Sequence, residues 1–140
     1  MKILLPVDGS SHSDRAVRHV ISEVNGGAGT EIALINVQLP IDSHELRGHM
    51  PASEIEDMQE ACGGDVLESA RALLDNAGVP YTAAVLIGPV AETIVRYAVE
   101  NSCGKIVMGT RGLGVIGSFL MGSVATRVFG MTKLPVTLVK

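Results

Sequence analysis

Apolar and polar positions follow two recurring patterns that alternate along the whole chain. Some stretches are short, continuous apolar runs, as expected of strands that are covered on both faces of a sheet. In the stretches between them, apolar residues recur every three or four positions, which is the spacing of one helical face. Strands are therefore predicted at residues 2–7, 31–37, 81–87, 105–109 and 135–140.

The first two helical segments begin at serines that are good N-cap residues. One helix is predicted over residues 11–24, with Ser11 as its cap. A longer one is predicted over about 53–77, where Ser53 and Glu56 form a capping-box pattern. The apolar residues that repeat along this longer helix predict its core face: Ile55, Met58, Cys62, Val66, Ala70, Leu73 and Ala77.

Glycine and proline mark the other helical features. Gly63-Gly64 weakens the middle of the long helix, so a kink is possible there. Pro89 suits the first turn of a third helix that continues to about Asn101. A short helix then precedes the last strand. Its predicted inward residues are Val124, Ala125, Val128 and Phe129.

Five strands separated by helices predict βαβ units, and right-handed crossovers then give a parallel sheet. The expected fold is α/β, a doubly wound five-stranded parallel sheet with helices on both faces, in a single domain over residues 1–140. Ligands of such sheets bind beyond the carboxyl ends of the strands, where the winding reverses. The ends that matter here are Val7-Asp8, Val37 and Met108-Gly109.

Composition excludes some partners. A net charge of −4, with two Tyr, two Phe and no Trp, provides neither the basic footprint nor the stacking platforms of a nucleic-acid-binding protein. The apolar run near the N-terminus is too short for a signal peptide or a membrane span, so a cytoplasmic location and no membrane contact are expected. Cys62 and Cys103 lack metal-ligand spacing, and two buried, reduced thiols are predicted.

Glycines concentrate between the fourth strand and the last helix, in GTRGLGVIGSFLMGS. Within it, GLGVIG matches the dinucleotide pattern G-x-G-x-x-G. That site also needs an acidic residue about 20 positions later and a second mononucleotide-binding half. The chain has Thr137 at that place, so a dinucleotide site is not expected.

A wider pattern combines Gly109, Gly112, Gly122 and Ser123. It places glycines after a strand and directly before a helix, so backbone N–H groups and a helix N-terminus should converge. Such a place binds anions, and Ser123 is positioned to cap the helix or to contact a phosphate oxygen. The alternative is that the glycines only form a mobile loop and Ser123 is only a cap.

With this motif the sequence resembles the universal stress protein family, whose nucleotide-binding members carry G-x2-G-x9-G-[ST] before the last helix. The similarity also covers ILLPVDGSxxS, the strand ending INV, GPVAETIV and LPVTLVK. The resemblance implies an adenine nucleotide alpha-hydrolase-like, Rossmann-like fold that binds ATP. It implies these binding positions: Pro6, Val7, Asp8, Val37, Met108, Gly109, Gly112, Gly122, Ser123 and Val124.

Among these positions, Asp8 corresponds to the carboxylate near the ribose or a Mg²⁺ ion, and Val37 to the residue whose backbone faces adenine. A helix cap is the alternative role for Asp8. Arg111, inside the glycine turn, could donate to a phosphate or be simply exposed. The sequence departs from the family at Lys105, where an acidic or small residue is common, and at INV, where His-Val is more usual.

Catalytic residues are not predicted. The chain has neither the P-loop pattern with its Lys nor a G-x-S-x-G elbow. The four histidines, His12, His19, His44 and His49, lack a zinc spacing and are interpreted as solvated. Binding is therefore favoured over turnover. A partner-binding module of the same fold and a slow ATPase or self-phosphorylating protein remain the alternatives.

The last strand, residues 136–139, has no helix after it and would leave an apolar edge exposed. Pairing with its copy across a two-fold axis would cover that edge. The resemblance implies dimerisation in this manner, so a homodimer through Val136 to Val139 is expected. The alternative is an edge protected by the charged terminus.

Overall fold

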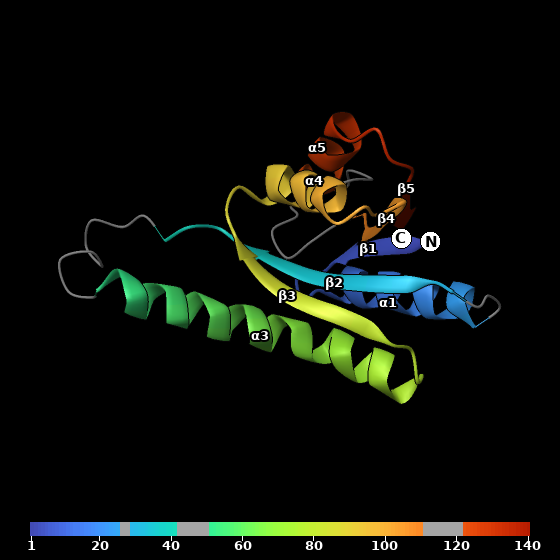
Figure 1. Cartoon of the computed structure of the whole chain (residues 1–140), viewed down its shortest axis with the longest axis horizontal. Helices are drawn as coiled ribbons and strands as arrows, with labels where there is room; N and C mark the ends of the chain where they lie inside the picture. The colour runs from blue at the N-terminus through green and yellow to red at the C-terminus, as the bar shows by residue number, and fades with distance from the viewer. Residues whose placement is uncertain (26–28, 42–50, 111–121) are drawn as a thin grey trace.

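A computed structural model describes residues 1–25, 29–41, 51–110 and 122–140, which form one parallel sheet flanked by helices (Figure 1). The strand order is β3-β2-β1-β4-β5, which confirms the predicted α/β, doubly wound class. The elements are β1 (Lys2–Pro6), α1 (Ser11–Val24), β2 (Glu31–Gln38), α3 (Ala52–Asn76), β3 (Tyr81–Ile87), α4 (Val90–Glu100), β4 (Lys105–Gly109), α5 (Ser123–Met131) and β5 (Val136–Val139).

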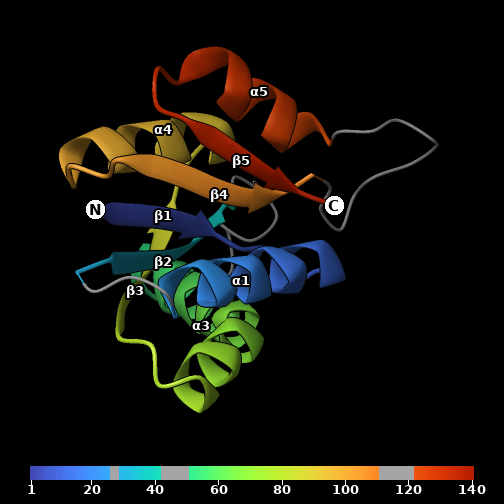
Figure 2. The same ribbon diagram turned by 90° about the vertical axis from the view of Figure 1, so that its right-hand side faces the viewer.

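The sheet separates α1 and α3 on one face from α4 and α5 on the other (Figure 2), and a buried apolar cluster lies on each face. Alternate strand residues point to opposite faces, so Leu5 and Leu34 pack under α1 and α3. Their neighbours Leu4 and Ile35 pack against α4 and α5 instead. Because both faces are covered, the strands read as continuous apolar runs rather than as alternating ones.

The winding of the chain reverses between β1 and β4. From β1 the chain proceeds to β2 and β3 on one side, then crosses to form β4 and β5 on the other. The carboxyl ends of β1 and β4 therefore border the switch point at which doubly wound sheets bind ligands. Asp8 and Gly109, predicted at these ends, lie at this place.

The predicted core face of α3 is confirmed at Ile55 and Ala70 but is wrong near the middle of the helix. Met58 and Cys62 are exposed, so Cys62 is not the buried thiol that was expected, whereas Cys103 is buried. The helix runs through Gly63-Gly64 as one element. Its buried residues are Ile55, Gln59, Gly63, Leu67, Ala70 and Leu74.

Gly63 explains why the buried face of α3 differs from the apolar face of its sequence. A Cβ atom at this position would lie 2.4 Å from Val85 Cγ1 of β3 and 3.2 Å from Asn36 Oδ1 of β2. The missing side chain lets the helix backbone approach the sheet directly. Gly63 therefore allows close packing of α3 on the sheet, in addition to lowering the helix propensity at this position.

Three predicted helix details differ in the structure. The cap of α1 is Ser10, whose hydroxyl accepts from Ser13 N at 3.2 Å. Helix α3 begins after Pro51, so the pattern at Ser53 lies inside its first turn and forms no cap. Phe129 is 62% exposed because its neighbour Val128 occupies the buried position of α5.

Candidate functional site

The end of β1 is held through both backbone groups of Val7. Its N–H donates to Ile35 O at 2.9 Å, and its carbonyl accepts from Asn36 Nδ2 at 2.8 Å. The Val7 side chain is buried, as is Pro6 before it. This strand end can therefore form a rigid wall of a ligand site, and Asp8 follows directly after it.

Asp8 is bound to the first turn of α1. Its Oδ1 accepts from Ser10 N at 2.9 Å and from Ser13 Oγ at 2.8 Å, while Ser13 Oγ accepts from Asp8 N at 3.0 Å. Gly9, with φ of +83°, makes the turn between strand and helix possible. The carboxylate is half-buried and orders the turn before α1, whose N-cap is Ser10 and not Asp8.

The end of β4 lies against that same helical turn. A Cβ atom at Gly109 would be 2.8 Å from both the carbonyl carbon and the carbonyl oxygen of His12. Only glycine fits such an approach without movement of the backbone. Met108, predicted beside it, is buried among the α4 and α5 side chains.

Both ends of the glycine-rich segment meet beside β5. Thr110 N donates to Val139 O at 3.0 Å, and Gly122 N donates to Thr110 O at 2.5 Å. Gly109 and Gly122 are therefore brought together, as the motif predicted. Arg111 and Gly112 lie outside the described residues.

Gly122 is the N-cap of α5, and Ser123 is the first helical residue and exposed. The predicted capping role of Ser123 is therefore wrong. The Gly122 carbonyl accepts from Thr126 N at 3.0 Å and from Thr126 Oγ1 at 2.9 Å. As in any α-helix, the first amides, including those of Ser123 and Val124, have no partner inside the helix. They can donate to an anion.

Val37 lies at the carboxyl end of β2, next to Leu86 of β3. Its half-buried side chain packs on the sheet face covered by α4 and α5. It therefore lies on the same face of the sheet as α5.

Two residues at this edge were missed as site residues. His12 was interpreted as solvated, but its Nδ1 is buried and has no partner among the residues described. Asn36, noted only as a departure from a family pattern, is buried and holds Val7. Of the other histidines, His19 does lie at the surface, and His44 and His49 fall outside the described residues.

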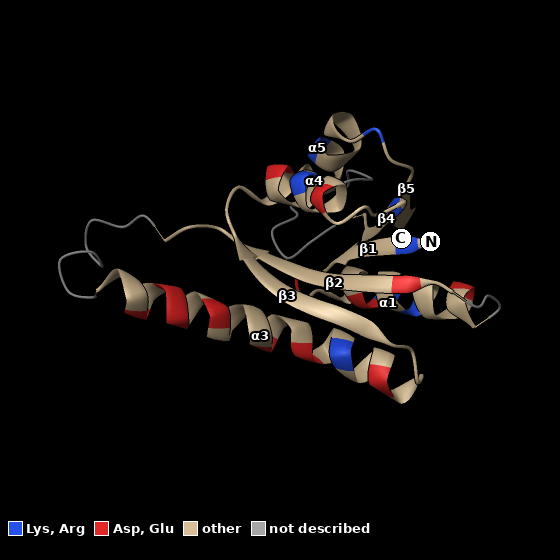
Figure 3. Cartoon of the chain, viewed as in Figure 1, with Lys and Arg blue, Asp and Glu red and all other residues tan. Residues whose placement is uncertain are grey.

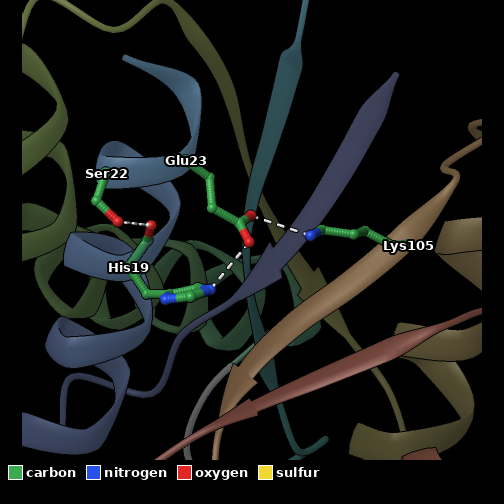
Figure 4. Close-up of polar contacts among 4 residues, drawn as sticks. All are labelled: His19, Ser22, Glu23 and Lys105. Carbon is green, nitrogen blue, oxygen red and sulfur yellow. Dashed lines mark hydrogen bonds and ion pairs between the residues drawn. The ribbon is translucent and has the colours of Figure 1, made fainter. Parts of the chain in front are cut away.

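Lys105 lies at the opposite, amino edge of the sheet (Figure 4). Its Nζ donates to Glu23 Oε2 at 3.0 Å, and Glu23 Oε1 contacts His19 Nε2 at 3.1 Å. The hydrogen bond from Lys105 lowers the pKa of the Glu23 carboxyl group. This unusual lysine is thus paired away from the candidate site.

Acidic residues recur along α3, which carries seven Asp or Glu residues and one Arg (Figure 3). Helices α3 and α5 cover opposite faces of the sheet, so this negative charge is remote from the α5 amides. Within the described part of the chain, no three His, Cys, Asp or Glu side chains are grouped as metal ligands, and no helix is long and apolar enough to cross a membrane.

Comparisons with known proteins agree on one family. The profile of the universal stress protein family matches residues 1–140. A universal stress protein of Thermus aquaticus is 32% identical over 139 residues, covering 99% of this chain and 97% of the relative. Universal stress protein MJ0531 of Methanocaldococcus jannaschii is also 32% identical, covering 99% and 81%.

Solved structures share the fold. Hypothetical protein MJ0577 superposes with a TM-score of 0.84 at 24% identity, over 99% of this chain and 94% of the other. An Archaeoglobus fulgidus universal stress protein in complex with dAMP gives 0.67 at 21%, over 100% and 98%. An Arabidopsis thaliana universal stress family protein with AMP bound gives 0.71 at 20%, over 100% and 91%.

Proposed function

The chain belongs to the universal stress protein family, and from this premise we propose that it binds ATP at the carboxyl edge of its sheet. The observation that carries the proposal is the hydrogen bond between Gly122 N and Thr110 O, which joins the end of β4 to the start of α5. It supports the proposal because the N-terminus of α5 then begins beside the end of β4, one of the two strands that border the switch point, and helix N-termini bind anions. Related folds crystallised with dAMP and AMP support an adenine nucleotide as the ligand.

Each part of the site has a proposed role. The phosphates lie against the amides of Ser123 and Val124 and beside Gly122, whose own N–H donates to Thr110 O, and Arg111 and Gly112 complete the cradle. Pro6 and Val7 form one wall, Met108 and Gly109 form the floor, and the backbone of Val37 faces adenine. Asp8 contacts the ribose or a metal ion. The two hydroxyl groups of a ribose can donate hydrogen bonds to a carboxylate, so a ribose suits Asp8.

Mg²⁺ is proposed as a companion of the nucleotide rather than as a resident metal. It usually binds through one or two carboxylates together with substrate phosphates. Asp8 fits this role because Ser10 N and Ser13 Oγ already donate to its Oδ1 and so orient the carboxylate. When bound, the ion would neutralise part of the phosphate charge, and the chain itself would supply only the oriented carboxylate.

The proposed role is that of a cytoplasmic, homodimeric signalling or stress-response module, and not of an efficient enzyme. Backbone amides and one fixed carboxylate hold a polyphosphate, whereas rapid hydrolysis also needs a positioned water and positive charge at the γ-phosphate. Edge strand β5, residues Val136–Val139, is the proposed dimer contact. All four of its residues are only partly covered within one chain.

Thermal unfolding with and without ATP and Mg²⁺ tests the proposal. A ligand at 100 times its Kd stabilises the folded state by about 2.7 kcal/mol, which raises Tm by several degrees for a chain of this size. The matched variant is Gly122→Val, which bulks the N-cap that starts the amide cradle. We expect millimolar ATP to raise Tm of the wild type and to have much less effect on the variant. An unchanged wild-type Tm would reject nucleotide binding.

A further inference from the structure

Amide side chains, buried at Asn36 and Gln59 and half-buried at Gln38, lie between the candidate site and α3. Asn36 and Gln38 are two apart on β2, so they point to the same face of the sheet. Asn36 Nδ2 donates to Val7 O at 2.8 Å, and Gln38 Nε2 donates to Asn36 Oδ1. Gln59 of α3 reaches Leu39 O, just beyond the same strand.

These contacts fix the Asn36 amide group in one orientation. Its nitrogen donates to the Val7 carbonyl and its oxygen accepts from Gln38. A flipped amide would place its oxygen against the Val7 oxygen and its nitrogen against the Gln38 nitrogen, so both hydrogen bonds would be lost. Asn36 is 3% exposed, and a buried polar side chain at this position would be costly without its partners. Helix α3 closes over it at Gly63, whose absent Cβ leaves Asn36 Oδ1 its space.

The geometry points to Asn36 as a positioning residue for the ligand site, acting through Val7 on Asp8. This inference rests on the proposed nucleotide binding. Val7 O belongs to the peptide group that leads into Asp8, so the donor from Asn36 fixes the plane of that peptide and the direction of the carboxylate. The Ser10 and Ser13 contacts then hold Asp8 from the helix side. Gln38 holds the Asn36 amide in this orientation by donating to its Oδ1.

A leucine at position 36 is the direct test, because it keeps the size of the side chain and removes the donor. For Asn36→Leu we expect at least a fivefold weaker affinity for ATP by calorimetry, at a temperature where the variant is fully folded. Gln38→Leu should weaken ATP binding less, because it frees the Asn36 amide without deleting it. The control is Leu74→Ala, which lowers stability at a buried site toward the other end of α3 and should leave ATP affinity unchanged.

Amide hydrogen exchange provides a readout that needs no nucleotide. Exchange at Asp8, Ser10 and Ser13 should become at least fivefold faster relative to the core strands in Asn36→Leu, and should keep its relative rate in Leu74→Ala. If Asn36→Leu does not fold, the same comparison is made with Gln38→Leu. Unchanged exchange at Asp8 together with unchanged ATP affinity would overturn the positioning role. Failure of the wild type to bind ATP would reject the proposed function alone, because the exchange result would still decide whether Asn36 orders Asp8.

Discussion

Gly109 at the end of β4 touches the backbone carbonyl of His12 in the first turn of α1. An ideal Cβ on Gly109 would lie 2.8 Å from that carbonyl carbon and oxygen and 2.9 Å from His12 Cβ. Asp8 is tied to the same turn through Ser13. The first turn of α1 is therefore the element on which the two strand ends of the switch point are assembled.

Replacement of Gly109 by alanine should strain this contact. The atoms that the new methyl group meets are mainly backbone, so relief requires a shift of β4 or α1. Overpacking of this kind costs about 1–3 kcal/mol of unfolding free energy. Urea denaturation measures the loss. The control is Gly130→Ala in α5, where an added Cβ meets nothing within 4 Å and no loss is expected.

The two neighbouring glycines of α3 should respond oppositely to alanine. At Gly63 the methyl group would meet Val85 Cγ1 at 2.4 Å, and Val85 is β-branched and has little freedom to rotate. At Gly64 nothing lies within 4 Å, so alanine gains helix propensity without a clash. We expect Gly64→Ala to stabilise by about 0.5–1 kcal/mol and Gly63→Ala to destabilise by about 1–3 kcal/mol. Equal effects in urea unfolding would contradict direct packing of α3 on the sheet.

The strands and the parallel sheet that they form could be predicted because they depend on local signals. Runs such as EIALINV fall between helices, and right-handed crossovers between them then give a parallel sheet. The motif also predicted that the start of the last helix lies near the end of the fourth strand, and the bond from Gly122 N to Thr110 O joins these two places. These features need no knowledge of which side chain meets which.

The errors arose where tertiary contact overrides apolar periodicity. Counting apolar residues along α3 selected Met58 and Cys62, whereas the sheet accepts Gln59 and Gly63. Gln59 is buried because it finds the Leu39 carbonyl, and Gly63 because the backbones approach there. Neither partner is near in sequence, so no local pattern could report it. Asn36 was not predicted as a site residue for the same reason, since its partner Val7 is distant in sequence.

Ser13 should matter more than its place in a polar turn suggests. Its hydroxyl accepts from Asp8 N and donates to Asp8 Oδ1, and the residue is buried. Ser13→Ala leaves both groups of Asp8 without this partner, which should cost about 1–3 kcal/mol of unfolding free energy. Ser11→Ala is the matched control, because Ser11 is exposed in the same turn. Similar losses in the two variants would show that the Asp8 contact contributes little.

The Glu23–Lys105 pair should give a small, pH-dependent contribution to stability. The lowered pKa of Glu23, caused first by the Lys105 hydrogen bond, means that the folded state favours the ionised carboxylate. The contribution is therefore present above the ordinary value of 4.5 and is lost as pH falls through the lower folded pKa. Partial exposure of both side chains limits it to about 0.2–1 kcal/mol.

The measurement is a comparison of wild type and Glu23→Gln in urea at several pH values. The wild type should be slightly more stable at pH 7, and the difference should shrink as pH falls from about 4.5 toward 3. The difference should also shrink in high salt, because salt screens exposed charges. A difference that grows on acidification would have the wrong sign for a carboxyl group with a lowered pKa.

Strand β5 should pair with its copy through the backbone groups that β4 leaves unused. Ile106 N donates to Pro135 O, just before β5, and Thr110 N donates to Val139 O at the end of β5. Because parallel ladders engage alternate residues, the N–H of Val136 should point to the open edge. Val136→Pro removes that N–H at the first residue of an edge strand, where proline is tolerated. We expect the variant to sediment as a monomer while keeping a native circular dichroism spectrum, and Val136→Ala, which shortens only the side chain, to remain dimeric. If Val136→Pro stays dimeric, the contact between copies involves another surface, and the exposed side chains of Phe129 and Met131 on α5 would be the next to replace.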